Sequence, residues 1–153
     1  MSTQNNSAPD LAQHPPRSPR VRLGGYVLLP RMLDKGRAEI AGTNGEYHYN
    51  CPLDQRLLAF LDLDAATLRQ ELATGKGDGE ILEWITANAK NKHTPWEVAQ
   101  WSAFHENRGP SSDEETWQMF GEMVGAVSKT REDITTWAAM LDLDDYVSFG
   151  GKA

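Results

Sequence analysis

Cysteine is almost missing from this chain: Cys51 is the single one among 153 residues. One cysteine excludes an intramolecular disulfide and is compatible with a reducing compartment. Long apolar runs are missing as well, because no window approaches the roughly 18 apolar residues that a membrane helix needs. The first residues have neither the basic nor the apolar region of a secretory signal. We therefore expect a cytoplasmic protein with no membrane partner.

An excess of positive charge is also lacking, since 15 Lys and Arg residues face 22 Asp and Glu residues, for a net charge of -7. Nucleic-acid binding needs a basic surface that displaces counterions from phosphates, so we expect no nucleic-acid partner. The charge is uneven, however: residues 14–37 hold six cations and one acid, and the chain beyond Arg37 carries -11. A cationic segment on an acidic body favours charge-steered association with an acidic protein or a second copy of the chain.

No repeated strand pattern is present, whereas seven segments place apolar residues at helical spacing. The pattern predicts an all-α fold, a compact irregular bundle of six to seven helices. Residues 1–20 are rich in Ser, Asn, Gln and Pro without an apolar period. They predict a disordered or extended, flexible arm whose arginines lie against the acidic body. Residues 21–153 are long enough for one helical domain with a single core.

Local signals predict the helix boundaries. Pro30 suits the first turn of a helix that begins near Leu29, and Gly42 is a natural stop. Gly36 inside this helix costs about 1 kcal/mol relative to Ala, so another helix or a ligand should approach it closely. Thr94 opens a capping box, T-P-W-E, and a helix that runs to about residue 105. Further helices are expected to begin at Pro52 and after the caps Asp64 and Asp78. Two more are expected to begin at capping boxes, Ser112 with Glu115 and, as a weaker version, Thr130 with Asp133. The tail from residue 142 shows no period.

The first predicted helix carries a polar sector made of Arg31, Asp34, Lys35 and Arg37. Arg31 and Lys35 are four residues apart and Asp34 and Arg37 three apart, so each pair shares a face. Guanidinium forks and an ammonium group can hold a carboxylate or a phosphate. The alternative is a solvated helix face whose cations pair with nearby acids.

The loop that follows, from Glu46 to Asp54, combines acids with Tyr47, His48 and Cys51. The spacing of His48 and Cys51 suits metal ligands, but strong zinc signatures need paired ligands, so we expect neither a metal nor another cofactor. Cys51 could act as a nucleophile with His48 as its base. Alternatively, the cysteine is a small buried hydrophobe, and Asp54 is explained by the dipole of the helix it opens.

We consider three interpretations of these residues. The first is a domain that binds a small anionic ligand around residues 31–54, with catalysis as an option; it predicts that Lys35 and His48 converge on one concavity. The second is a non-catalytic interaction module or homodimer that uses the cationic N-terminal segment. The third is a buried polar network, for example Arg37 or Lys35 paired with Asp54 or Glu46. The candidate catalytic residues are His48, Cys51, Asp34 and Glu46; the candidate ligand-binding residues are Arg31, Lys35, Arg37, Tyr47 and Asp54.

Five motifs of this chain together resemble a bacterial family designated domain of unknown function 5069. They are PRSPR at Pro16, LGGYVLLPRMLDKGRA at Leu23, GEYHYNCPLDQ at Gly45, DGEILEW at Asp78 and TWAAMLDLDDYVSFGGK at Thr136. The resemblance covers residues 16–152 and implies a helical protein without a transferable activity. It also implies that residues 34–37 and 46–54, which fill the two most distinctive motifs, belong together.

Overall fold

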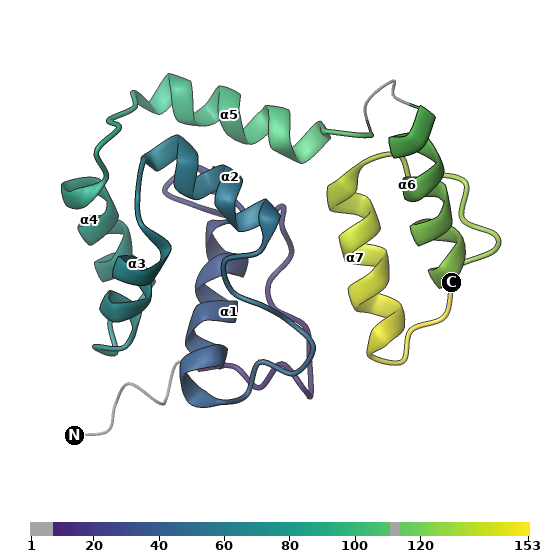
Figure 1. Cartoon of the computed structure of the whole chain (residues 1–153), viewed down its shortest axis with the longest axis horizontal. Coiled ribbons are helices and arrows are strands. Elements are labelled where there is room, and N and C mark those ends of the chain that lie inside the picture. Colours follow the sequence, from purple (N-terminus) through teal and green to yellow (C-terminus); the bar gives the residue numbers. More distant parts are fainter. Residues whose placement is uncertain (1–7, 111–113) are drawn as a thin grey trace.

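The computed structural model describes residues 8–110 and 114–153, which form seven α-helices and one two-stranded sheet and so confirm the all-α class. In Figure 1, α1 to α4 form one group, α5 runs across its top, and α6 and α7 stand beside it as a pair, each running from the top of the view downwards. No helix in these two ranges has the length and hydrophobicity needed to cross a lipid bilayer. The helices are α1 Leu29–Ala41, α2 Pro52–Leu61, α3 Ala65–Leu72, α4 Asp78–Asn88, α5 Pro95–Asn107, α6 Glu114–Val127 and α7 Trp137–Ser148.

A short hairpin precedes the first helix. Strand β1, Arg22–Leu23, pairs with β2, Tyr26–Val27, in antiparallel register. Gly24 and Gly25 form the turn with φ of 59° and 87°, a left-handed conformation that favours glycine. Ser102 of α5 fastens the hairpin, because its hydroxyl accepts from the backbone of β2 at 3.1 Å and donates to the carbonyl of the turn at 2.6 Å.

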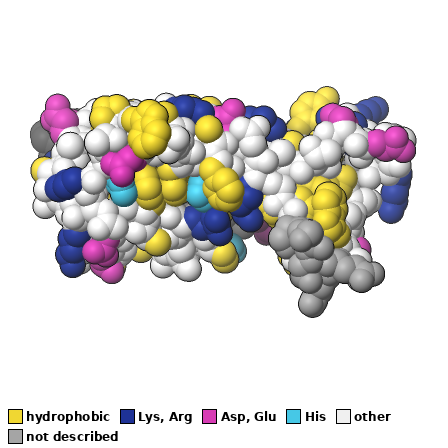
Figure 2. Space-filling view, turned by 90° about the horizontal axis from the view of Figure 1, so that it is seen from above, with side chains coloured by type: hydrophobic (Ala, Val, Ile, Leu, Met, Phe, Trp, Pro, Cys, Tyr) yellow, Lys and Arg dark blue, Asp and Glu magenta, His cyan; other side chains and the backbone are white. Residues whose placement is uncertain are grey.

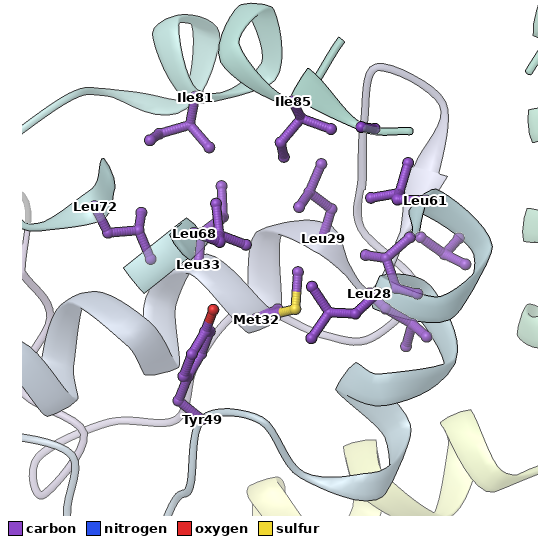
Figure 3. Close-up of a cluster of buried hydrophobic side chains, with 14 residues drawn as sticks. Leu28, Leu29, Met32, Leu33, Tyr49, Leu61, Leu68, Leu72, Ile81 and Ile85 are labelled. Atoms are coloured by element: carbon purple, nitrogen blue, oxygen red, sulfur yellow. The ribbon is translucent and has the colours of Figure 1, made fainter. Parts of the chain in front are cut away.

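Helix α1 is the centre of the larger core. It ends as predicted at Gly42, whose φ of 75° closes the last turn. The prediction of a close approach at Gly36 is also confirmed: a Cβ there would lie 2.6 Å from Cδ1 of Leu72, so α3 packs directly on this backbone. Figure 3 shows the buried side chains of this core; those labelled include Leu29, Met32, Leu33, Leu68, Leu72, Ile81 and Ile85.

A smaller apolar cluster joins α6 to α7. Both ends of α7 differ from the ends that the sequence predicted. Thr136, not Thr130, caps α7, since its hydroxyl accepts from the N–H of Ala139 at 3.1 Å. The carboxylate of Asp133 instead binds Arg131, so it is not available as a cap. The tail that showed no period is helical to Ser148. The predicted capping box at residue 112 lies outside the described residues.

The N-terminal segment is extended but it is not a loosely attached arm, at least from residue 8 onwards. Leu11 is only 1% exposed, and its N–H donates to the carbonyl of Thr43 at 2.8 Å. Pro16 and Pro19 are buried as well. Residues 1–7 of the predicted arm lie outside the described residues. The sequence predicted a flexible arm because three isolated buried residues, Leu11, Pro16 and Pro19, produce no periodic apolar pattern.

The arginines of this segment do lie against the acidic body, as expected. All six cations between residues 14 and 37 form ion pairs within the chain. Their carboxylate partners come from α1, α2, α4, α5 and α7, so the cationic segment is neutralised by the helices that it crosses. The pairs are Arg17 with Asp34 and Asp78, Arg20 with Asp142, Arg22 with Glu106, Arg31 with Asp145, Lys35 with Asp54, and Arg37 with Asp78.

Candidate functional site

A cleft of about 1210 Å³ lies between the pair α6–α7 and the segment that runs from residue 45 into α2. Its volume slightly exceeds the range typical of small-molecule sites, roughly 300–1,000 Å³. One wall is apolar and comes from α6, α7 and the residue that follows α7: Met119, Met123, Trp137, Met140, Leu141 and Phe149. The opposite wall is mostly polar and is built from α1, the loop of residues 43–51 and the start of α2. The cleft therefore suits a ligand with both apolar and polar parts.

Six of the nine candidate residues line this cleft: Arg31, Lys35, Glu46, Tyr47, His48 and Cys51. Lys35 and His48 thus share one concavity, which is the condition that the ligand-binding interpretation set. The other three candidates, Asp34, Arg37 and Asp54, do not line it. They point elsewhere on α1 and α2 and make ion pairs within the chain.

Lys35 stands at the floor of the cleft in a buried ion pair. Its Nζ lies 3.0 Å from Oδ2 of Asp54, and the two side chains are 5% and 4% exposed. The same carboxylate accepts from the N–H of Asn50 at 2.9 Å, which ties the loop to the first turn of α2. Of the pairings that the third interpretation offered, the structure shows the one between Lys35 and Asp54, whereas Arg37 pairs with Asp78. Buried charges must be paired in this way, since desolvation penalises a single one heavily.

Cys51 is half-buried on the cleft side of the same lysine. Its Sγ lies 3.2 Å from Nζ of Lys35, and Cys51 is the N-cap of α2, where the helix dipole favours negative charge. His48 is exposed, and within residues 8–110 no hydrogen bond joins it to Cys51. The catalytic interpretation of these two residues, and of Glu46, therefore stays a prediction. The described residues contain no group of three His, Cys, Asp or Glu side chains that could hold a metal ion.

Arg31 lines the cleft and connects α1 to α7. Its guanidinium forms two hydrogen bonds with the carboxylate of Asp145, at 2.8 and 3.3 Å, and both side chains are buried. The hydroxyl of Tyr47 donates to the same carboxylate at 2.7 Å, and its ring stacks on Phe149. Burial, together with this hydrogen bond, raises the pKa of the Tyr47 hydroxyl. The arrangement fixes the C-terminal half of α7 against α1.

Asp34 and Arg37 belong to a second network on the far side of α1. Arg17 bridges the carboxylates of Asp34 and Asp78 at 3.0 and 2.7 Å, and Arg37 binds Asp78 at 2.7 Å. Asp78 is the first residue of α4 and Gly77 its N-cap, so the predicted capping role of Asp78 is wrong. Burial alone would raise the pKa of Asp78, but the hydrogen bonds from Arg17 and Arg37 lower it below its ordinary value. This network attaches the N-terminal segment to α1 and α4.

One known protein family covers the segments that build this site. The family model described as domain of unknown function (DUF5069) matches residues 13–147. The chain belongs to the DUF5069 family. The match includes both polar networks and most of the cleft, from Arg31 on α1 to Asp144 on α7. A comparison with curated proteins finds no match to this chain.

Three polar residues of this DUF5069 chain were not predicted as part of the site: Arg56, His105 and Arg108. Arg56 and Arg108 line the cleft near the start of α7, where the N–H of Trp137 donates to the carbonyl of Arg108 at 3.0 Å. His105, at the end of α5, is buried rather than exposed. Figure 2 shows that apolar, cationic and histidine side chains gather near the middle of the α5 face. A sequence signal for the two arginines is lacking, because they are 52 positions apart and no local motif connects them.

Proposed function

We propose that this protein binds a small organic anion in the cleft between α2 and the pair α6–α7. The observation that supports the proposal is the charge of the lining. Among the described residues, four cations, Arg31, Lys35, Arg56 and Arg108, line the cleft together with two carboxylates, those of Glu46 and Asp144. In the chain as a whole, acids outnumber cations by 22 to 15. Arg31 and Lys35 are paired with the buried carboxylates of Asp145 and Asp54, so the cations of the lining that remain for a ligand are Arg56 and Arg108. Cations beside an apolar wall select the anions of organic molecules.

The alternative, an interaction module that docks through the cationic N-terminal segment, has less support. Its premise was a set of cations open to a partner, and each of the six is already paired with a carboxylate of the chain. Association with an acidic protein would first have to break these pairs. We therefore favour the small-molecule proposal.

Cys51 offers a direct test, because it is the single cysteine and faces the cleft. The rate at which a neutral disulfide reagent, 4,4′-dithiodipyridine, labels this thiol is measured with and without a panel of organic carboxylates, sulfonates and phosphate esters. An anion that occupies the cleft should slow the labelling about tenfold or more at a concentration well above its Kd. It should also raise the Tm, since a ligand at about 100 times its Kd adds roughly 2.7 kcal/mol to the free energy of unfolding.

A matched control places the thiol outside the cleft. The variant Cys51→Ser/Ala87→Cys moves it to the exposed face of α4, where the same anion should leave the labelling rate unchanged. Neutral amides or alcohols of the same shape as the anions control for charge. If no anion in the panel protects Cys51 or raises the Tm, the proposal is refuted.

A further inference from the structure

Two arginines of this chain differ from all the others. Of its nine arginines, seven form an ion pair with a carboxylate of a described residue. The two that form none in this part of the chain, Arg56 and Arg108, both line the cleft, and the charge of each lowers the pKa of His105. Arg31 and Lys35, in contrast, have their own buried carboxylates. Within the described part of the chain, an incoming anion would therefore find the positive charge without a carboxylate partner at Arg56 and Arg108.

His105 holds Arg56 without neutralising it. Nε of Arg56 donates to Nε2 of His105 at 2.9 Å, and Nδ1 of His105 lies 3.0 Å from the carbonyl of Trp101. This pair of contacts requires the neutral tautomer with its proton on Nδ1. Burial, and further the charges of Arg56 and Arg108, lower the pKa of His105, so the ring is neutral near pH 7. The other four N–H groups of the Arg56 guanidinium make no hydrogen bond to a described residue.

Arg108 is held beside Arg56 by the end of α5. Its guanidinium lies over the ring of Trp137, with Cζ 5.8 Å from the ring centre, a contact that orients the group but removes no charge. Burial, followed by the charge of Arg56, lowers the pKa of Arg108. Two cations in partial desolvation repel each other. A bound anion would relieve this repulsion and accept the open N–H groups.

The surroundings of these arginines indicate the class of anion. The carbonyl end of α5 lies beside Arg108, its C-cap residue, and its partial negative charge disfavours a dianion more than a monoanion. The two carboxylates of the lining, Glu46 and Asp144, lie nearer Tyr47, at the other end of the cleft. Between the two ends runs the apolar wall. From Trp137 to Asp144, α7 advances about 10 Å at roughly 1.5 Å per residue.

We propose, on the basis of the anion-binding function above, that Arg56 and Arg108 bind the carboxylate of an amphipathic organic acid whose apolar body lies along α6 and α7. His105 is a positioning residue, which holds Arg56 in place through a neutral hydrogen bond. Arg31 and Lys35 then have a structural role and do not contact the anion. This assignment moves the anion contact from α1, where the sequence predicted it, to the junction of α2 and α5.

The test measures binding by isothermal titration, with decanoate below its micelle concentration as the probe. Arg56→Gln and Arg108→Gln should each weaken binding about tenfold or more, since each removes charge-assisted hydrogen bonds. The matched control is Arg69→Gln, which removes an exposed arginine of α3 and should change the Kd less than about twofold. Decanol should bind at least about tenfold more weakly than decanoate. Butyrate, which is six methylenes shorter, should bind about a thousandfold more weakly, because each buried methylene contributes a roughly three- to fourfold factor.

The role of His105 has its own readout. His105→Leu, which offers no acceptor, should weaken decanoate binding, whereas His105→Gln, which offers an amide oxygen to Arg56, should restore most of it. Equal losses in the two variants would refute the positioning role. Circular dichroism on each variant confirms that it is folded before its Kd is compared.

Other outcomes separate this inference from the proposed function. If butyrate or a phosphate ester protects Cys51 and decanoate does not, the cleft binds anions but the amphipathic class is wrong. If decyl phosphate binds more tightly than decanoate, the inferred preference for a monoanionic head group is wrong. If Arg56→Gln and Arg69→Gln have equal effects on decanoate, the subsite is wrong even though the cleft is occupied. If no anion protects Cys51, both proposals fail.

Discussion

The buried pair of Lys35 and Asp54 permits a quantitative test of how this site is held together. Replacing Lys35 by Met keeps an unbranched apolar side chain that fills the space of the lysine stem and removes the ammonium group. The carboxylate of Asp54 then keeps one donor, the N–H of Asn50 at 2.9 Å, and loses its cation. The variant therefore isolates the electrostatic part of the interaction.

The expected loss is large. At 3.0 Å and an effective dielectric constant of about 20, two unit charges attract by roughly 5.5 kcal/mol. Desolvation of both groups offsets most of this, so the net contribution of the pair is small. Removal of one partner keeps the desolvation cost of the other, so we expect Lys35→Met to lower the free energy of unfolding by about 3–5 kcal/mol. In Lys35→Met/Asp54→Asn both charges are absent, so the double variant should lose less than Lys35→Met alone.

Urea unfolding at pH 7, followed through the fluorescence of the five tryptophans, measures both quantities. Lys129→Met is the control, since Lys129 is exposed and forms no ion pair with a described residue; its effect should lie within about 0.5 kcal/mol. A change of similar size in Lys35→Met would refute the reasoning, because it would mean that the ammonium group is not needed for the fold. Additive effects of the two substitutions would refute the pairing.

Other predictions address the packing and the titrating groups. Gly36→Ala should lower the Tm, because overpacking against Leu72 costs about 1–3 kcal/mol and outweighs the roughly 1 kcal/mol gained in helix propensity. Gly121→Ala on α6 is the control: a Cβ there meets nothing within 4 Å, so this substitution should raise the Tm. Tyr47→Phe removes a 2.7 Å hydrogen bond to a buried carboxylate and should cost about 1.5–3 kcal/mol in chemical unfolding; no measurable cost would contradict the contact. The pKa of His105 is lower in the folded protein than its ordinary value of about 6.5. The resulting contribution to stability is fully present at a pH above 6.5 and is lost as the pH falls through the lower, folded-state pKa. His105→Gln should therefore flatten the decline of the Tm below about pH 6.5, and an unchanged decline would contradict the assignment.

Much of the helical architecture follows from the sequence, because helix ends depend on local chemistry. Gly42 stops α1 and Thr94 caps α5, and in each case residues within one turn satisfy the free backbone groups. The same logic located Gly36 as a point of close approach, although it could not say that Leu72 would be the neighbour. Where a side chain had a competing partner, local logic failed. Asp133 binds Arg131 and Asp78 binds two arginines, so neither caps its helix.

The candidate site shows the same division. The sequence by itself determined which residues of segment 31–54 carry charge, and helical spacing placed Arg31 and Lys35 on one face of α1. Only the tertiary structure decided their partners, because any of the 20 acids beyond Arg37 could have served, and attraction depends on distance in space rather than in sequence. It also decided which arginines have no carboxylate partner among the described residues. Arg56 and Arg108 come together because α5 crosses α2 and ends beside α7.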